Sequence, residues 1–525
     1  MRKRIILSKT AKTESAPAQN NQNDQLDQTI QSSENDNDPI STDLTQNFER
    51  IKQTFSKCVD FTMDTYRYGT DLSYTILSAH FDSMTGDNEL EFVKQTFQDL
   101  VTHWVGKTEG ITPEDVIGFF GQSGVSTRKV HLVDQMDQAI DHILNGHFVI
   151  FFDGWDRAIS YDATAIKTRE VTEPAAESVV QGPREGTVEN IETNVGLLRS
   201  RLKNPNFKME SIISNGKTKT VVIYGYLEGA VDSETLKEFK KRISKVKENE
   251  ILETSYVEEL IEDSTYSPFP QYRYTERPDV AVANLLEGKI IVMVQGTGTI
   301  LICPGLFTEF FQSSEDYYQR TVFSSVIRQL RVIAFFIALT LPGIYISLST
   351  FNPELVPTVL LLAVIDSREG IPFPTFVEAI IMQFFFELLR EAGIRLPRPV
   401  GSAVSIVGAL VIGEAAINAG IASPIMVVVV ALTGIASFSI PRYSIAISLR
   451  ILQFPLMFMA ATLGIFGMMI GMMWIFLHLI TLRTLGQPYF APISPLRPKF
   501  FADVFLRAPV TLFKTPRHRH RSNKS

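Results

Sequence analysis

Two glutamates that interrupt a long apolar stretch are the positions where this sequence could do chemistry. Residues 332–482 consist mainly of Ile, Leu, Val, Phe, Met, Gly and Ala, and Glu378 and Glu414 stand there without an oppositely charged residue at helical spacing. Placing an ionised side chain in the middle of a bilayer costs about 2.5–3.5 kcal/mol on insertion scales, so such residues face water or a partner. We therefore expect Glu378 and Glu414 to line a pore or to couple a conformational change.

A third acidic residue has a partner close in the sequence. Glu387 and Arg390 are three residues apart, a spacing that brings two side chains together on a helix, so we expect an ion pair at the membrane edge. Glu378 and Glu387 are nine residues apart and point to opposite faces of a straight helix. They cannot both line one pore from that helix.

A charged tip separates two apolar stretches. It contains Asp366, Arg368 and Glu369 and ends at Gly370. The sequence allows two interpretations, a gate or a solvated loop.

Small residues recur at every fourth position in two places. They are Gly401, Ser405, Ala409 and Gly413 in one segment, and Gly467 and Gly471 in another. Small side chains let membrane helices approach closely. The same van der Waals contact serves packing within one subunit or between subunits, and both interpretations stay open.

The sequence contains no recognised pattern of a catalytic, cofactor or metal site. Neither H-E-x-x-H nor G-x-S-x-G occurs, and the phosphate-loop ending at Asn215–Thr218 has Ser211 in place of the first glycine. Cys58 and Cys303 cannot make a four-cysteine zinc site. Residues 182–186 could cradle an anion, but we favour a helix-entry loop. We therefore expect no enzyme activity, cofactor or metal.

The apolar stretch has the length and composition of a polytopic helical membrane domain. Candidate segments are 332–350, 373–389, 401–413, 415–440 and 451–480, and the segment 355–365 is too short to span and could be re-entrant. The 30 residues of 451–480 would form one helix that tilts or extends past the bilayer. We expect four to six membrane segments within 332–482.

Basic residues near the segment ends predict the orientation. Residues 486–525 carry eight basic residues and one acid, a net charge of +7, whereas the whole 525-residue chain carries −7. We expect this tail and the N-terminal region to be cytoplasmic, although five full spans would separate them. An acidic body with a basic tail argues against nucleic acid as a partner, and the N-terminus lacks the apolar run of a signal peptide.

The region before the membrane segments predicts an α/β fold in two subdomains. We expect a disordered polar tail at 1–45, α/β subdomains at 46–124 and 125–310, a connector helix at 311–331, and a basic tail at 483–525. Turn-forming Asp153-Gly154 and Asn215-Gly216 predict β-hairpins, and Ser233 is a plausible N-cap of a charged helix. A further strand pair is expected over 289–303.

Short motifs, each weak alone, occur together in both halves of the chain. In the soluble half they are Thr172-Glu173-Pro174, Gly182-Pro183-Arg184-Glu185-Gly186, Thr275-Glu276-Arg277-Pro278-Asp279 and Leu285-Leu286-Glu287-Gly288-Lys289. In the apolar half they are Ser367-Arg368-Glu369-Gly370, Pro372-Phe373-Pro374, Arg390-Glu391-Ala392-Gly393 and Leu396-Pro397-Arg398-Pro399. Together they resemble the GerA family of spore germination proteins, A-subunit type, over roughly residues 125–515.

The resemblance implies an A subunit of a germinant receptor in the spore inner membrane. It implies a transporter-like B subunit and a lipoprotein C subunit as partners, and self-assembly into a ring whose membrane helices conduct ions. Gln295 and Gln383 depart from the pattern, because an acid is common at both positions, and Asp366 is unusual beside Ser367-Arg368.

Two hypotheses for the function follow. The first is a nutrient-gated ion channel subunit, and the alternative is a non-conducting scaffold that relays nutrient binding by a partner subunit. An active transporter is disfavoured because the chain shows no inverted repeat.

Overall fold

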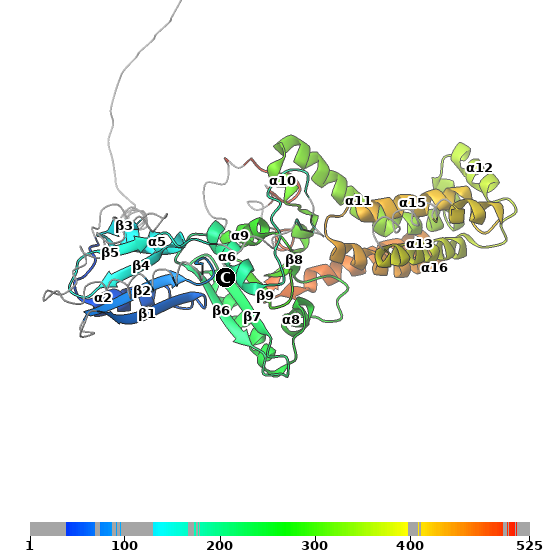
Figure 1. The fold of residues 1–525 in the computed structure, drawn as a ribbon. Coiled ribbons are helices and arrows are strands. Elements are labelled where there is room, and N and C mark those ends of the chain that lie inside the picture. Colours follow the sequence, from blue (N-terminus) through cyan, green and yellow to red (C-terminus); the bar gives the residue numbers. More distant parts are fainter. Residues whose placement is uncertain are drawn as a thin grey trace, which may run out of the picture.

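The structure is a computed structural model of the chain. It describes residues 38–68, 74–86, 91, 95, 130–165, 173–174, 177, 179–396, 408, 411–496, 501, 503–509 and 511. Two sheet domains and a group of helices follow one another along the length of the molecule (Figure 1). The expected disordered tail lies mostly outside the described residues.

The first sheet has five antiparallel strands in the order β1-β2-β4-β5-β3. The strands are β1 Phe61–Tyr68, β2 Tyr74–Phe81, β3 Val130–Val133, β4 Phe148–Phe152 and β5 Ala158–Tyr161, and helices α2 Leu44–Thr54 and α5 Met136–Leu144 pack on one face. The expected β4–β5 hairpin is confirmed. The expected domain boundary at 124 is wrong, because strands from both sides of it pair in one sheet.

Residues just before α2 belong to this domain. Ile40 is buried, and its backbone N–H donates to the Asp134 carbonyl at 3.2 Å. The polar tail therefore ends earlier than residue 45. Composition suggested disorder because the segment offers few side chains to bury, whereas Ile40 and backbone hydrogen bonds to Asp134, Met136 and Gly154 hold its last part in place.

The second sheet also has five antiparallel strands, in the order β6-β7-β9-β10-β8. The strands are β6 Phe207–Ile213, β7 Val221–Leu227, β8 Arg273–Thr275, β9 Ile290–Val294 and β10 Ile300–Cys303. One face is covered by α7 Ser233–Ile243, η1 Ser244–Glu248 and α8 Thr254–Ile261, and the other by α6 Ile191–Arg201 and α9 Pro278–Leu286. Both strand pairs expected in this region are confirmed.

The N-cap predicted for α7 is off by one residue. Ser233 is the first helical residue, and the side chain of Asp232 accepts from the Thr235 backbone N–H at 2.9 Å. An aspartate is as good a cap as serine and also favours the positive end of the helix dipole.

A buried ion pair joins the two sheet domains. Asp60 precedes β1, and its carboxylate accepts from Arg199 Nε and Nη2 of α6, both at 3.0 Å. Arg199 is 1% exposed and also donates to the Phe207 carbonyl at 2.7 Å. This two-point contact fixes how the first domain sits on the second.

The helical region begins within the expected connector. Short helices η2 Phe307–Phe311 and α10 Glu315–Tyr318 lead into α11 Thr321–Thr350, so the connector at 311–331 is not a separate helix. The helices that follow are η3 Pro353–Leu355, α12 Thr358–Ser367, α13 Thr375–Arg395, α15 Pro424–Phe438 and α16 Tyr443–Thr481. Among the described residues, α11 and α16 are long and apolar enough to cross a membrane by length and composition.

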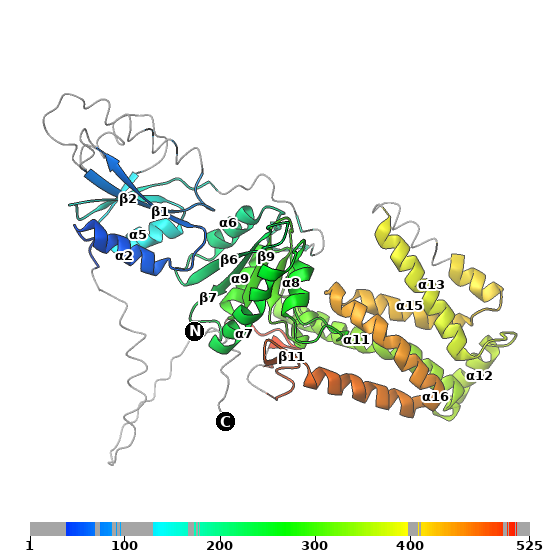
Figure 2. The ribbon, with the colours of Figure 1, turned by 90° about the horizontal axis from the view of Figure 1, so that it is seen from below.

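The expected single tilted helix over 451–480 is wrong, because α16 is a helical hairpin. Gly464 has φ +60° and ψ −143°, outside the helical range, and the tip lies beside Phe351 at the end of α11. Residues 443–463 and 465–481 form two arms that lie against each other, as Figure 2 shows. Sequence alone missed the reversal because the stretch is apolar throughout and has no polar turn.

The two glycines of the G-x-x-x-G lie between these arms. A Cβ on Gly467 would lie 2.8 Å from the Met459 carbonyl carbon, and one on Gly471 would lie 3.1 Å from Met459 Sδ. Both glycines therefore allow the two arms of α16 to pack closely within one subunit.

Part of the C-terminal tail folds back on the soluble region. Strands β11 Arg483–Thr484 and β12 Gln487–Pro488 pair with each other, and Tyr489 is buried. Farther on, the Asp503 carboxylate accepts from Arg328 Nη1 of α11 at 3.1 Å and from the Tyr317 hydroxyl at 2.7 Å. Over residues 483–496 and 503–509, the tail predicted from its charge is thus a strap across the base of the helices.

Replacing Arg199 by Ala should destabilise the protein by about 3–5 kcal/mol, because Asp60 would be left buried without its cation. Chemical denaturation of the detergent-solubilised chain, followed by circular dichroism, measures the change. Arg201→Ala is the matched control, since Arg201 is more exposed and pairs with Glu185 at the surface. Equal losses for both variants would contradict a special role of the buried pair.

Replacing Gly467 by Ala should prevent the two arms of α16 from closing. The added methyl group meets the Met459 backbone, which cannot rotate away as a side chain can. A cysteine pair at Leu456 and Gly471, which face each other across the arms, reports closure by disulfide formation. Crosslinking that survives the Ala substitution unchanged would show that the arms close without a glycine at 467, whereas a Leu456 and Gly471 cysteine pair that never crosslinks would refute the hairpin.

Candidate functional site: a polar layer between the helices

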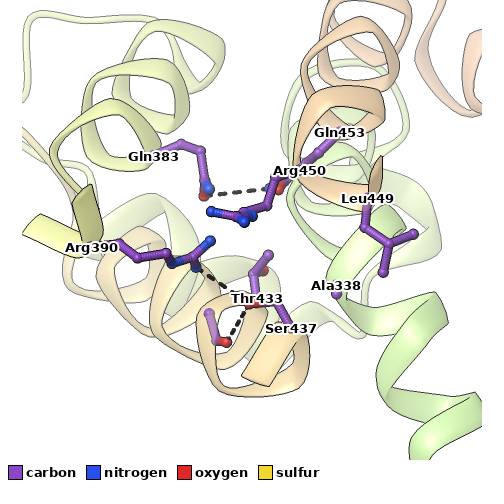
Figure 3. A pocket seen from close by; sticks show the side chains of 9 residues that line it. Ala338, Gln383, Arg390, Thr433, Ser437, Leu449, Arg450 and Gln453 are labelled. Carbon is purple, nitrogen blue, oxygen red and sulfur yellow. Dashed lines mark hydrogen bonds between the residues drawn. The ribbon is translucent and has the colours of Figure 1, made fainter. Parts of the chain in front are cut away.

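A cluster of polar side chains lies where α13, α15 and α16 meet, and α11 borders it (Figure 3). We call it the polar layer and define it as Gln383, Glu387, Arg390, Ser437, Arg450 and Gln453. Ala338, Thr433, Gly434 and Leu449 complete the lining of the small hollow at its centre. Most of the surrounding helix surface is apolar, so these groups must satisfy one another.

Glu387 of α13 is the acceptor at the centre of the layer. Its carboxylate accepts from Arg390 Nη1 at 3.3 Å, from Arg450 Nη1 at 3.2 Å and from Gln383 Nε2 at 3.3 Å. The expected pair with Arg390 is confirmed, and Arg450 joins it from the first arm of α16. One carboxylate thus ties two helices together.

Arg390 is almost fully enclosed. Its side chain is 8% exposed, its guanidinium carbon lies 4.8 Å from the Phe386 ring centre and 4.9 Å from that of Phe438, and Nη2 donates to Ser437 Oγ at 3.3 Å. Two aromatic faces partly replace the water that a guanidinium loses on burial. Arg390 Nε is buried and has no hydrogen-bond partner among the residues that the structure describes.

An amide pair extends the layer. Gln453 Nε2 of α16 donates to Gln383 Oε1 at 3.4 Å, and Figure 3 shows the two side chains meeting across the space between their helices. Gln383 therefore accepts from α16 and donates to Glu387 within α13. A neutral amide can do both, whereas an ionised acid at this position could only accept.

Glu378 lies in a separate polar contact at the start of α13. It is 0% exposed, one oxygen is 3.1 Å from Arg368 Nη2, and the other accepts from the Ser423 backbone N–H at 3.0 Å. Ser423 is the N-cap of α15. The structure thus supplies the partner that helical spacing did not, ten residues away across the turn after α12, and it connects the charged tip with two helices.

The other predicted site residues lie elsewhere. Asp366, Glu369 and Glu414 are exposed, and a Cβ on Gly413 would make an ordinary 3.5 Å contact with Val427 of α15. Gly401, Ser405 and Ala409 lie outside the described residues.

Four contacts join the helices to the second sheet domain. Arg442, the N-cap residue of α16, donates to the Tyr274 carbonyl at 3.1 Å and forms an ion pair with Glu177. At the other end of the hairpin, His478 Nε2 lies 2.8 Å from Ser267 Oγ. Ser448 in the first arm donates to the Pro268 carbonyl. The second sheet domain therefore contacts both arms of α16.

The strand that carries Tyr274 is held from its other side as well. The Tyr274 hydroxyl donates to Glu258 of α8, and burial raises the pKa of Glu258 to about 7. Both ends of Tyr274 are thus occupied, the backbone by Arg442 and the side chain by Glu258.

Arg450 and Gln453, like Ser437, are members of the layer that the sequence did not reveal. Arg450 marked the end of a loop by its charge, and Gln453 is a neutral residue in an apolar stretch. Their partners on α13 are 63 and 70 residues away, beyond the reach of helical spacing.

Replacing Glu387 by Ala should lower the stability of the helical region by about 2–3 kcal/mol, because Arg390 and Arg450 would then face each other without a carboxylate. The thermal midpoint in detergent is the measurement, with Glu391→Ala as the control because Glu391 is an exposed acid on the same helix. Adding Arg450→Met to Glu387→Ala should recover part of the loss. If the second substitution does not raise the thermal midpoint again, charge balance does not stabilise the layer.

Comparison with known proteins places this arrangement in a family. A crystal structure of the N-terminal domain of the A subunit of the Bacillus megaterium spore germinant receptor GerK3 aligns with 52% of this chain and 99% of that chain, at 24% identity and a TM-score of 0.40. Spore germination protein KA of Bacillus subtilis (strain 168) is 45% identical over 373 residues, which cover 71% of this chain and 69% of that protein.

Two further relatives from the same organism cover more of the chain. Spore germination protein A1 is 37% identical over 433 residues, 82% of this chain and 87% of that protein, and the uncharacterized membrane protein YfkQ is 40% identical over 476 residues, 91% of each. Residues 49–519 match the family described as Bacillus/Clostridium GerA spore germination protein. The chain therefore belongs to the GerA family of spore germination proteins.

Proposed function

We propose that the protein is the A subunit of a nutrient germinant receptor in the spore inner membrane and that copies of it assemble into a ligand-gated ion channel that starts germination. In this proposal the helical region crosses the membrane several times, with the N-terminal region and the C-terminal strap on the cytoplasmic side. A transporter-like B subunit and a lipoprotein C subunit complete the receptor.

The observation that carries the channel proposal is the polar layer. Ionisable side chains within apolar helices mark ion paths and conformational couplings, because each would otherwise be costly to keep in lipid. Here Glu387, Arg390 and Arg450 come from two helices and meet beside a hollow lined by a third. Glu387 and Arg450 keep 25% and 13% of their side-chain area exposed, so the layer has an open side.

The buried pair of Arg368 and Glu378 fits a coupling role better than pore lining. Glu378 is fully enclosed in this conformation and holds the start of α15 through Ser423. Separation of Arg368 from Glu378 would expose the Glu378 carboxylate. We therefore assign the turn after α12 to the gate rather than to the conducting surface.

The contacts of Arg442, Ser448 and His478 with the second sheet domain are also compatible with the alternative function. They would serve equally in a non-conducting scaffold that relays nutrient binding by a partner subunit to other spore proteins. Ion flux separates the two functions, because a relay needs the contacts but no conduction.

Purified protein, with and without its partner subunits, should release K⁺ from loaded liposomes in the presence of the nutrient. Glu387→Gln should change the rate or the ion preference of this release by about tenfold while assembly survives, because it alters the charge of the layer. Glu391→Gln is the matched control on the same helix.

Flux that is absent under every nutrient, with the receptor assembled, would contradict the channel and support the relay. Flux that Glu387→Gln and Glu391→Gln affect equally would place the conducting path away from the polar layer.

A further inference from the structure

The polar layer carries an unbalanced positive charge. Two arginines, Arg390 and Arg450, share the single carboxylate of Glu387, which leaves a net charge of +1 among apolar helices. A charge that is enclosed and uncompensated is costly, so a further anion is expected close by.

Two donors of the layer are free to bind such an anion. Arg450 donates through Nε to the Ala446 carbonyl and through Nη1 to Glu387, and its Nη2 donates to no residue that the structure describes. Arg390 Nε is likewise buried without a partner, in a side chain that is more than nine-tenths enclosed. Arg450, on the open side of the layer, is the group that a carboxylate could reach.

An acid that lacks a positively charged partner among the described residues lies on the outer surface of the same helical region. Glu414 is exposed, forms no ion pair or hydrogen bond with the residues described here, and stands on a helical stretch, 411–418, that also exposes Val411 and Ile417. In a bilayer this carboxylate would face hydrocarbon unless a partner covers it.

The acid lies level with the near end of the layer, at Gln383, about 15 Å along α15 from Ser437 at its far end. Helix α15 starts at the level of Glu378, which binds Ser423, and reaches the level of Arg390 at Ser437, so α13 and α15 run side by side in the same direction. Gly413 packs on Val427, four residues after Ser423, which corresponds to the level of Gln383. Glu414 follows directly in the sequence.

The contacts of a single chain do not join the two. Arg450 donates to the Ala446 carbonyl and to Glu387. Glu414 is exposed and pairs with no residue that the structure describes.

We propose that Glu414 of one copy binds Arg450 in the polar layer of the next copy. This ion pair neutralises the layer and removes the exposed carboxylate, and around a closed ring it forms once at every interface. The exposed apolar side chains of Val428, Leu432 and Ile435 on α15 would be covered at the same contact. The inference rests on the proposed assembly and adds two residues, Glu414 and Arg450, that would align neighbouring copies.

Disulfide crosslinking between copies of the full chain in membranes tests the contact. Glu414→Cys and Arg450→Cys, placed on two differently tagged copies, should give a mixed crosslinked dimer at least about tenfold above the control pair Glu369→Cys and Arg450→Cys. Glu369 is an exposed acid outside the proposed interface, and the native cysteines Cys58 and Cys303 are buried. A yield equal to that of the control pair would overturn the proposal.

Charge reversal gives a second test, in which Glu414→Arg alone leaves the layer intact and Arg450→Glu also changes the layer. Glu414→Arg should lower the recovery of one tagged copy with another by about tenfold, and combining it with Arg450→Glu should restore much of the loss. If Arg450 binds a lipid phosphate instead, Glu414→Arg has no effect on recovery, and the proposal fails. Since neither test uses ion flux, a crosslinked but non-conducting protein would refute the channel and keep the contact.

Discussion

Charge compensation among apolar helices is the constraint on which the rest of the helical region depends. A guanidinium or carboxylate that leaves water must find a partner, and here the partners come from different helices. Glu387 connects α13 with α16. Glu378 connects α13 with the turn after α12 and with the N-cap residue of α15. These few polar contacts therefore determine the relative positions of helices whose apolar surfaces could slide past one another.

The same principle acts at the joints of the soluble region. Asp60 and Arg199 fix the first sheet domain on the second, and Asp503 holds the C-terminal strap on Arg328 at the base of α11. Buried ion pairs fix a geometry more than they add net stability, because desolvation offsets much of their attraction. In this GerA-family protein they occur where one part of the fold meets another.

Sequence reasoning succeeded where the physics is local. Turn residues at Asp153-Gly154 and Asn215-Gly216 predicted hairpins that the structure has, and the spacing of Glu387 and Arg390 predicted their ion pair. It failed where a contact bridges distant segments. No local pattern marks Arg450 as the second partner of Glu387, and the turn at Gly464 is hidden because apolar side chains continue on both sides of it.

Reaction of single cysteines along α13 with a membrane-impermeant thiol reagent, in intact membranes, tests most directly whether the helices lie in lipid around the polar layer. Phe384 and Leu388 are 55% and 51% exposed in the single chain, whereas the Glu387 side chain is 25% exposed. The account predicts that Glu387→Cys reacts and that Phe384→Cys and Leu388→Cys, facing lipid, do not. Reaction rates that follow the exposed areas instead, with positions 384 and 388 fastest, would show that α13 stands in water and would contradict the account.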